Sequence, residues 1–245
     1  MPADVPTILA TSGGFLPGDR TALRPGPLLD HAVALARPAS VPRICFVGTA
    51  LGDQAHWAAA IHAAYYERDA VVTHCNLFPM PNLADAEAHL RSRDVVWVGG
   101  GSTANLLALW RLHGLDRILR GCWESGVVLG GVSAGSLCWH TGGTTDSFGP
   151  VLAPVTDALG FLPWSNGVHY DSEEQRRPLF QRLMSEGTLP AGYATDNGVG
   201  LHYEGTELAE AVTEVAGKGA YFVERGPDGV RETRIEPRVL PGAAG

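Results

Sequence analysis

The fold is decided by the stretch Val127-Val128-Leu129-Gly130-Gly131-Val132-Ser133-Ala134-Gly135. It is an apolar run that ends in a G-x-S-x-G motif, and the residues after it, 136–139, are able to form a helix. A serine at such a strand-to-helix turn is held in a strained backbone, and small neighbours let the chain pass tightly. The motif alone also fits a glycine-rich turn with a capping serine.

Upstream of this stretch, short apolar runs alternate with longer helical patterns. The apolar runs predict strands at residues 6–11, 43–48, 71–77 and 94–98. The intervening spacing predicts helices at residues 28–36, 54–68, 84–91, 103–113 and 115–125. Strands separated by helices indicate βαβ units, and continuous apolar strands are typical of a sheet buried on both faces. We therefore predict a three-layer α/β fold with a mostly parallel sheet flanked by helices.

Downstream of residue 142 the pattern changes. Residues 144–164 are rich in Gly, Pro, Asp and Thr and are interpreted as long loops, and residues 173–186 as a helix. Extra C-terminal strands are predicted at 198–203, 220–224 and 230–235, the last two joined by a hairpin turn. Without a repeat or a long linker, residues 1–245 are expected to form a single domain.

Composition excludes several classes of protein. The 245 residues carry 18 basic and 26 acidic side chains, a net charge of −8, and this argues against nucleic acid as a partner. The N-terminus lacks the basic and apolar regions of a secretory signal, and no run of 18 apolar residues suggests a membrane partner. The four cysteines form no CxxC pair and are expected to be reduced in a cytoplasmic protein.

A second glycine-rich segment, Gly99-Gly100-Gly101-Ser102-Thr103-Ala104-Asn105, follows a predicted strand and opens a helix. Its glycines let a substrate approach the backbone and leave N–H groups free to donate. It lacks the lysine of a P-loop and the spacing of a dinucleotide fingerprint. Taken alone it is equally a plain turn, but its place one strand before Ser133 favours an oxyanion hole.

A nucleophilic serine needs a base, and the base needs an orienting group. Among the nine histidines, His169 stands out because it lies in a predicted loop downstream of Ser133. The others fall on helical or strand patterns and are interpreted as surface or core residues: His31, His56, His62, His74, His89, His113, His140 and His202. Candidate orienting acids are Asp146, Asp157, Asp171 and Asp196, of which Asp146 gives the chain order Ser, Asp, His.

Together these segments resemble the peptidase E (aspartyl dipeptidase) family, whose relatives include cyanophycinase. The resemblance covers about residues 94–203. It rests on the glycine loop with Asn105 and Leu106, the G-x-S-A-G elbow, Thr144-Thr145-Asp146 and the His169-Tyr170 pair. It implies a class I glutamine amidotransferase-like (flavodoxin-like) fold in which serine replaces the amidotransferase cysteine. It also implies that the enzyme uses no metal and no cofactor.

The resemblance further implies residue roles. Ser133 would attack the scissile carbonyl, His169 would accept its proton, and Asp146 would orient His169, with Asp171 and Asp196 as alternatives. The N–H groups of Gly101 and Ala134 would form the oxyanion hole. Substrate-binding roles fall on four residues: Gly100, Asn105, Asp171 and Glu173.

Two positions depart from the family pattern. The family's Thr-Thr-Asn-Asp appears here as Thr144-Thr145-Asp146-Ser147, which leaves the identity of the orienting acid open. Glu173 stands where aspartyl dipeptidases have the arginine that holds the substrate's Asp carboxylate. A carboxylate there repels Asp substrates and favours cationic or neutral ones, unless Glu173 is only an acid at a helix N-terminus.

The sequence therefore predicts a cytoplasmic serine peptidase of dipeptidase type, acting on small peptides as a monomer or homodimer. One alternative is an esterase or another amidohydrolase that uses the same elbow. The other alternative is a non-catalytic amidotransferase-like domain that binds a small ligand.

Overall fold

The computed structural model describes residues 3–244, and its largest element is an eight-stranded sheet. The strand order is β16-β13-β12-β1-β7-β6-β4-β5. The bounds are β1 Thr7–Thr11, β4 Arg43–Val47, β5 Val71–His74, β6 Val95–Val98, β7 Val128–Val132, β12 Val199–Glu204, β13 Glu207–Val215 and β16 Arg238–Ala244. Strands β1, β7, β6, β4 and β5 are parallel, and β12 joins β1 antiparallel.

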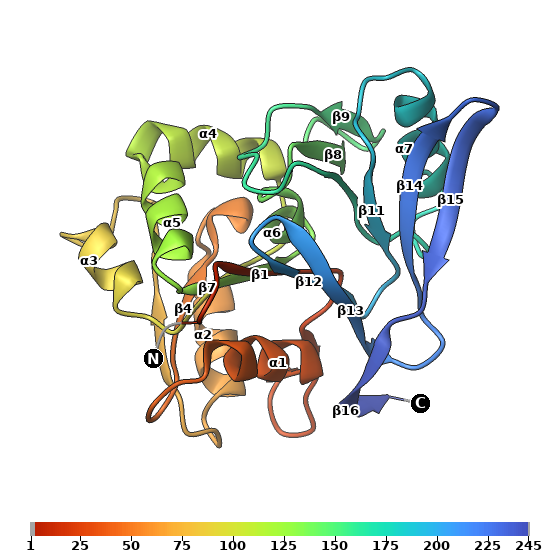
Figure 1. Cartoon of the computed structure of the whole chain (residues 1–245). Coiled ribbons are helices and arrows are strands. Elements are labelled where there is room, and N and C mark those ends of the chain that lie inside the picture. The colour runs from red at the N-terminus through yellow and green to blue at the C-terminus, as the bar shows by residue number, and fades with distance from the viewer. Residues whose placement is uncertain (1–2, 245) are drawn as a thin grey trace.

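Helices cover both faces of this sheet (Figure 1). Helices α1 (Pro27–Ala36) and α2 (Ala55–Ala64) pack on one face, where Leu9 contacts the apolar side of α1. Helices α3 (Ala86–Arg91), α4 (Thr103–His113) and α5 (Leu115–Glu124) pack on the other face, where Ile8 and Ala10 lie. Alternate residues of β1 thus enter opposite cores, as expected of a doubly covered sheet. The predicted three-layer α/β fold is confirmed.

A second sheet of six strands lies beside the first (Figure 1). Its order is β15-β14-β11-β10-β8-β9, with bounds β8 Gly142–Thr145, β9 Ala153–Val155, β10 Ser165–Gly167, β11 Gly192–Thr195, β14 Ala220–Gly226 and β15 Gly229–Ile235. Helix α7 (Arg176–Ser185) packs on it through Phe180 and Met184. The predicted C-terminal strands and hairpin are confirmed.

Some predicted boundaries were wrong. Residues 144–164 are not all loop, because the end of β8 and the whole of β9 fall there. The helix predicted at 54–68 ends at Ala64, before the turn residues 66–67. The remaining elements are the short helix α6 (Ala134–Leu137), the 3-10 turn η1 (Thr49–Leu51) and the hairpin of β2 (Phe15–Pro17) with β3 (Leu23–Pro25). Within residues 3–244, no helix has both the length and the apolar character needed to cross a bilayer.

His140 lies directly behind α6 and has no exposed surface. Its Nδ1 is 2.9 Å from the Ser136 carbonyl oxygen, and its Nε2 is 3.3 Å from the Tyr203 hydroxyl. Burial lowers the pKa of His140 to about 4, although the Ser136 carbonyl partly opposes this shift. The ring is therefore neutral in the folded protein at pH 5–7, whereas in the unfolded chain it becomes protonated below about pH 6.5.

The stability of the fold is expected to fall with acidification partly through His140. Because the folded pKa is depressed, its contribution is complete above pH 6.5 and is lost as pH falls towards 4. Between pH 7 and 5 the loss from His140 is about 2 kcal/mol. Urea unfolding at pH 7 and at pH 5 measures this loss. Between these pH values the free energy of unfolding of His140→Gln should fall by about 2 kcal/mol less than that of the wild type. His113→Gln, at an exposed position, should show the same fall as the wild type. An unchanged pH slope in His140→Gln would contradict the assignment.

Candidate active site

Ser133 lies on a sharp turn between β7 and α6. Its φ and ψ are 58° and −111°, a conformation that non-glycine residues rarely adopt. The flanking glycines are sterically required: a Cβ on Gly135 would lie 2.2 Å from the Val98 carbonyl oxygen, and one on Gly131 would lie 2.5 Å from the Gly135 oxygen. A strained serine kept in place by crowded neighbours fits a functional elbow better than a capping turn.

The C-terminal end of β1 holds both Ser133 and His169. The Ser133 N–H donates to the Thr11 carbonyl oxygen at 3.0 Å, and the His169 N–H donates to the Ser12 hydroxyl at 3.1 Å. The Ser12 hydroxyl is fixed in turn by that of Thr195 at 2.7 Å. The last residue of β1 and the residue that follows it therefore bring the predicted nucleophile and base to the same edge of the parallel strands, where open α/β sheets bind ligands.

The orienting partner of His169 is Asn197. Its Oδ1 lies 2.6 Å from Nδ1 of His169. An amide oxygen only accepts, so Nδ1 carries the proton and Nε2 is left as the basic nitrogen. The Asn197 N–H donates to Asp171 Oδ1 at 2.9 Å, and Asp171 Oδ2 pairs with Lys218 at 2.5 Å. Burial opposes the shift, but these donors hold the pKa of Asp171 below its usual range.

The side chain that contacts Nδ1 of His169 is therefore Asn197 and not the predicted Asp146. Asp146 is exposed and lines a hollow of about 490 Å³ together with Glu173. Asp196 accepts hydrogen bonds from the Gly219 N–H and the Tyr221 hydroxyl. Asp171 accepts a hydrogen bond from the backbone N–H of Asn197, which in turn contacts His169. Asn197 was missed because only carboxylates were considered as partners, although asparagine takes this place in some catalytic triads.

The glycine-rich loop passes beside the nucleophile. A Cβ on Gly100 would lie 3.2 Å from Cβ of Ser133. Gly101 has φ of +127°, and a Cβ there would collide with the Ala50 carbonyl oxygen at 2.4 Å. Among residues 3–244, the N–H groups of Gly101 and Ala134 donate to no other group, so both are available to a substrate. Asn105 is exposed and lines a separate hollow with Phe78.

Glu173 is paired rather than free. Its Oε2 lies 2.6 Å from Nε of Arg176, which is 3% exposed and also donates to the Thr144 carbonyl oxygen. Arg177 pairs with Glu232. Both arginines of this segment are therefore bound within the protein, and neither replaces the arginine that the family uses to hold an Asp side chain.

A cavity of about 390 Å³ adjoins Ser133, the predicted nucleophile. Gly13, Gly100 and Val132 form the end next to Ser133. Its walls are mainly apolar and come from several parts of the chain, with Phe15, Phe46, Trp57, Ile61 and Trp97 among them.

The polar groups of this cavity carry no positive charge near pH 7. Burial and the nearby His62 lower the pKa of His74 to about 4. Asp53 Oδ2 is occupied by the N–H groups of Leu77 and Phe78. The lining contains neither lysine nor arginine in the part of the chain that the structure describes, so a carboxylate side chain would find no cation there.

Comparisons with known proteins identify the family of the chain. The model of peptidase family S51 matches residues 8–211. The chain is 39% identical to the Bacillus subtilis (strain 168) protein named uncharacterized peptidase YgaJ, over 86% of this chain and 91% of the relative. It is 29% identical to peptidase E of Shewanella amazonensis (strain ATCC BAA-1098 / SB2B), over 57% of this chain and 61% of that protein.

The fold is also similar to a solved one. The crystal structure of a peptidase from an acI-B1 Actinobacterium superposes with a TM-score of 0.66 over 95% of both chains. Sequence identity to it is 14%, so this likeness concerns the fold alone.

Proposed function

The chain belongs to peptidase family S51, and on that premise we propose that it hydrolyses small peptides through Ser133, with His169 as base and Asn197 as the residue that orients it. The observation that supports this proposal most directly lies at the end of β1. There the Thr11 carbonyl oxygen accepts a hydrogen bond from the Ser133 N–H, and the Ser12 hydroxyl accepts one from the His169 N–H. Four buried, unpaired cysteines support a reducing, cytoplasmic environment.

In the proposed mechanism, Ser133 Oγ attacks the scissile carbonyl carbon while its proton passes to Nε2 of His169. The carbonyl oxygen becomes negative and accepts hydrogen bonds from the N–H groups of Gly101 and Ala134. His169 then protonates the leaving amine, and water hydrolyses the acyl-enzyme by the same route in reverse. Asn197 keeps the Nδ1 proton of His169 in place throughout.

We further propose that the substrate residue beside the scissile bond carries an apolar or uncharged side chain. The cavity next to Ser133 has aromatic and aliphatic walls, and its lining offers no cation to a carboxylate. This extends the expectation that strict Asp-X specificity is absent. It rests on the cavity rather than on Glu173, whose charge is balanced by Arg176.

The direct test is hydrolysis of a panel of dipeptides and aminoacyl-arylamides that differ in the first residue. Labelling with a fluorophosphonate, followed by peptide mapping, identifies the nucleophile. Turnover together with a label on Ser133 is the expected result. Folded protein that neither turns over any substrate nor reacts at Ser133 would favour the non-catalytic, ligand-binding alternative.

Asn197 is expected to act as a positioning residue. Asn197→Ala should lower kcat by about 100-fold with a small change in KM, because a loosely held imidazole loses part of the 10²–10⁴-fold benefit of general base catalysis. Asn197→Asp should retain activity but move the acidic limb of the kcat/KM profile to higher pH, since an adjacent carboxylate stabilises the imidazolium.

The measurement is the pH profile of each variant, with Ser185→Ala as the control, because Ser185 is exposed at the end of α7. A purely structural role for Asn197 would lower activity equally at all pH values in both variants. That outcome would reopen the assignment to Asp146.

A further inference from the structure

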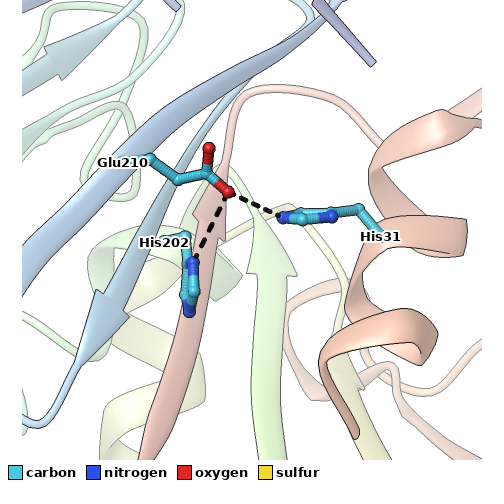
Figure 2. A group of neighbouring side chains, drawn as sticks. All are labelled: His31, His202 and Glu210. Carbon is cyan, nitrogen blue, oxygen red and sulfur yellow. Dashed lines mark ion pairs between the residues drawn. The ribbon is translucent and has the colours of Figure 1, made fainter. Parts of the chain in front are cut away.

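A separate group of side chains lies on the α1 side of the large sheet. Figure 2 shows His31, His202 and Glu210 pointing towards one another from α1, β12 and β13. His202 is paired with Leu9 on β1 and with Glu210 on β13, so these three residues lie in one row across the sheet. Their side chains face the same side of the sheet, where Leu9 packs against α1.

The three side chains present one ligand atom each to a common point. Glu210 Oε1 is 3.6 Å from Nε2 of His31 and 3.8 Å from Nδ1 of His202, and all three atoms lie within 4.8 Å of one another. These distances are too long for hydrogen bonds. Four-coordinate zinc with bonds of about 2.0–2.1 Å places its ligand atoms about 3.3 Å apart. The two distances to Glu210 Oε1 would have to shorten by a few tenths of an ångström, and the distance between the two nitrogens by at most about 1.5 Å, which side-chain rotation can supply.

The two imidazole nitrogens are buried without partners. Nε2 of His31 and Nδ1 of His202 have no hydrogen-bond partner among the described residues, and the side chains are 12% and 7% exposed. A buried polar atom without a partner is costly and calls for an explanation such as an ion. Both atoms are directed at the same carboxylate oxygen, which makes a bound cation the simplest explanation.

The charge states suit a metal that prefers nitrogen ligands. Burial lowers the pKa of His31 and of His202, so both rings are neutral near pH 7 and keep their lone pairs. Hydrogen bonds from Arg238 lower the pKa of Glu210, which is therefore ionised. Neutral imidazole with carboxylate is a typical zinc donor set.

Arg238 fixes the carboxylate and also affects the choice of metal. Its Nε donates to Oε2 of Glu210 at 2.8 Å and its Nη2 donates to Oε1 at 2.7 Å. Oε1 still has a second lone pair, and ligating carboxylates are commonly held by such outer hydrogen bonds. The guanidinium charge opposes any cation, which disfavours Mg²⁺ and Ca²⁺ more than ions that bind imidazole strongly.

We propose that His31, His202 and Glu210 form a divalent transition-metal site, best suited to Zn²⁺, with water as the fourth ligand. The site would tie α1 to β12 and β13. It would be structural, since its residues lie outside the groups assigned to peptide hydrolysis, and it is independent of the proposed function. It departs from the expectation that the enzyme uses no metal, and it gives the metal no part in catalysis.

Titration calorimetry of the EDTA-treated, tag-free protein with ZnCl₂ tests the site. We expect saturable binding of one Zn²⁺ per chain, and Co²⁺ should give the visible absorption of a four-coordinate site. His202→Gln and Glu210→Gln should each weaken binding by more than about 100-fold, beyond what loss of an outer-shell group costs. His113→Gln, at an exposed position, and Ser133→Ala should bind as the wild type does.

Circular dichroism is used to check that each variant is folded. If His202→Gln does not fold, Glu210→Gln still tests the site. The proposal is overturned if the wild type binds no Zn²⁺ or Co²⁺ at one equivalent. It is also overturned if both folded variants bind as tightly as the wild type. Loss of peptidase activity in Ser133→Ala with metal binding intact separates this site from the proposed function.

Discussion

Ser133→Ala is expected to lower kcat for peptide hydrolysis by at least about 10⁴-fold, because no acyl-enzyme can form without the hydroxyl. The residual rate would come from binding and from the oxyanion donors. Alanine keeps the backbone of the elbow, so the fold should be retained. The measurement is the initial rate on the best dipeptide of the panel at saturating concentration, together with a thermal melt.

Ser185→Ala is the matched control, since Ser185 is exposed at the end of α7. It should leave the rate unchanged. A Ser133→Ala enzyme with rates within tenfold of the wild type would exclude Ser133 as the nucleophile. The roles proposed for His169 and Gly101 depend on Ser133 being the nucleophile. That result would therefore contradict the whole proposed mechanism.

Substrates with an apolar first residue are expected to be cleaved faster than Asp-X by at least about 100-fold in kcat/KM. Burying a Phe or Leu side chain in the cavity contributes about 1.5–3 kcal/mol, and an Asp side chain loses hydration there without gaining a cation. The measurement compares Phe-X, Leu-X, Ala-X, Lys-X and Asp-X peptides with the same second residue.

A pair of neighbouring alanines on α2 tests the cavity itself. Ala58 lines it, whereas Ala59 is exposed on the same helix and does not. Ala58→Phe fills space and should reduce kcat/KM for Phe-X by about 10- to 100-fold while sparing Ala-X. Ala59→Phe should change neither. If Asp-X is the best substrate, or if both variants behave alike, the cavity does not hold the first residue.

Much of the fold was predictable because its signals are local. Continuous apolar strands between helices predict a parallel sheet, and a serine between small residues after such a strand predicts an elbow. In the second sheet, β14 and β15 were predicted from their hairpin turn, but β8, β9 and β10 gave no comparable signal. They are three or four residues long, and β8 and β10 contain glycine, so pairing of β8 with β9 and β10, and of β10 with β11, stabilises them more than their own propensity does.

The candidate site was predictable only in part, for a related reason. Ser133 and the glycine loop follow strands directly, so their sheet edge could be inferred from sequence. The partner of His169 is chosen by tertiary contacts, and Asn197 reaches it from 28 positions away. The cavity beside Ser133 is lined by residues between 13 and 132, which share no pattern along the chain.

The attachment of both proposed catalytic residues to the end of β1 affects when activity can arise. Thr11 binds Ser133 across 122 positions and Ser12 binds His169 across 157, while β12 must pair with the other side of β1. During synthesis, β1 therefore waits for segments that are made much later. A chain that stops before residue 204 lacks a neighbour of β1, so the proposed active site can form only after β12 has been synthesised.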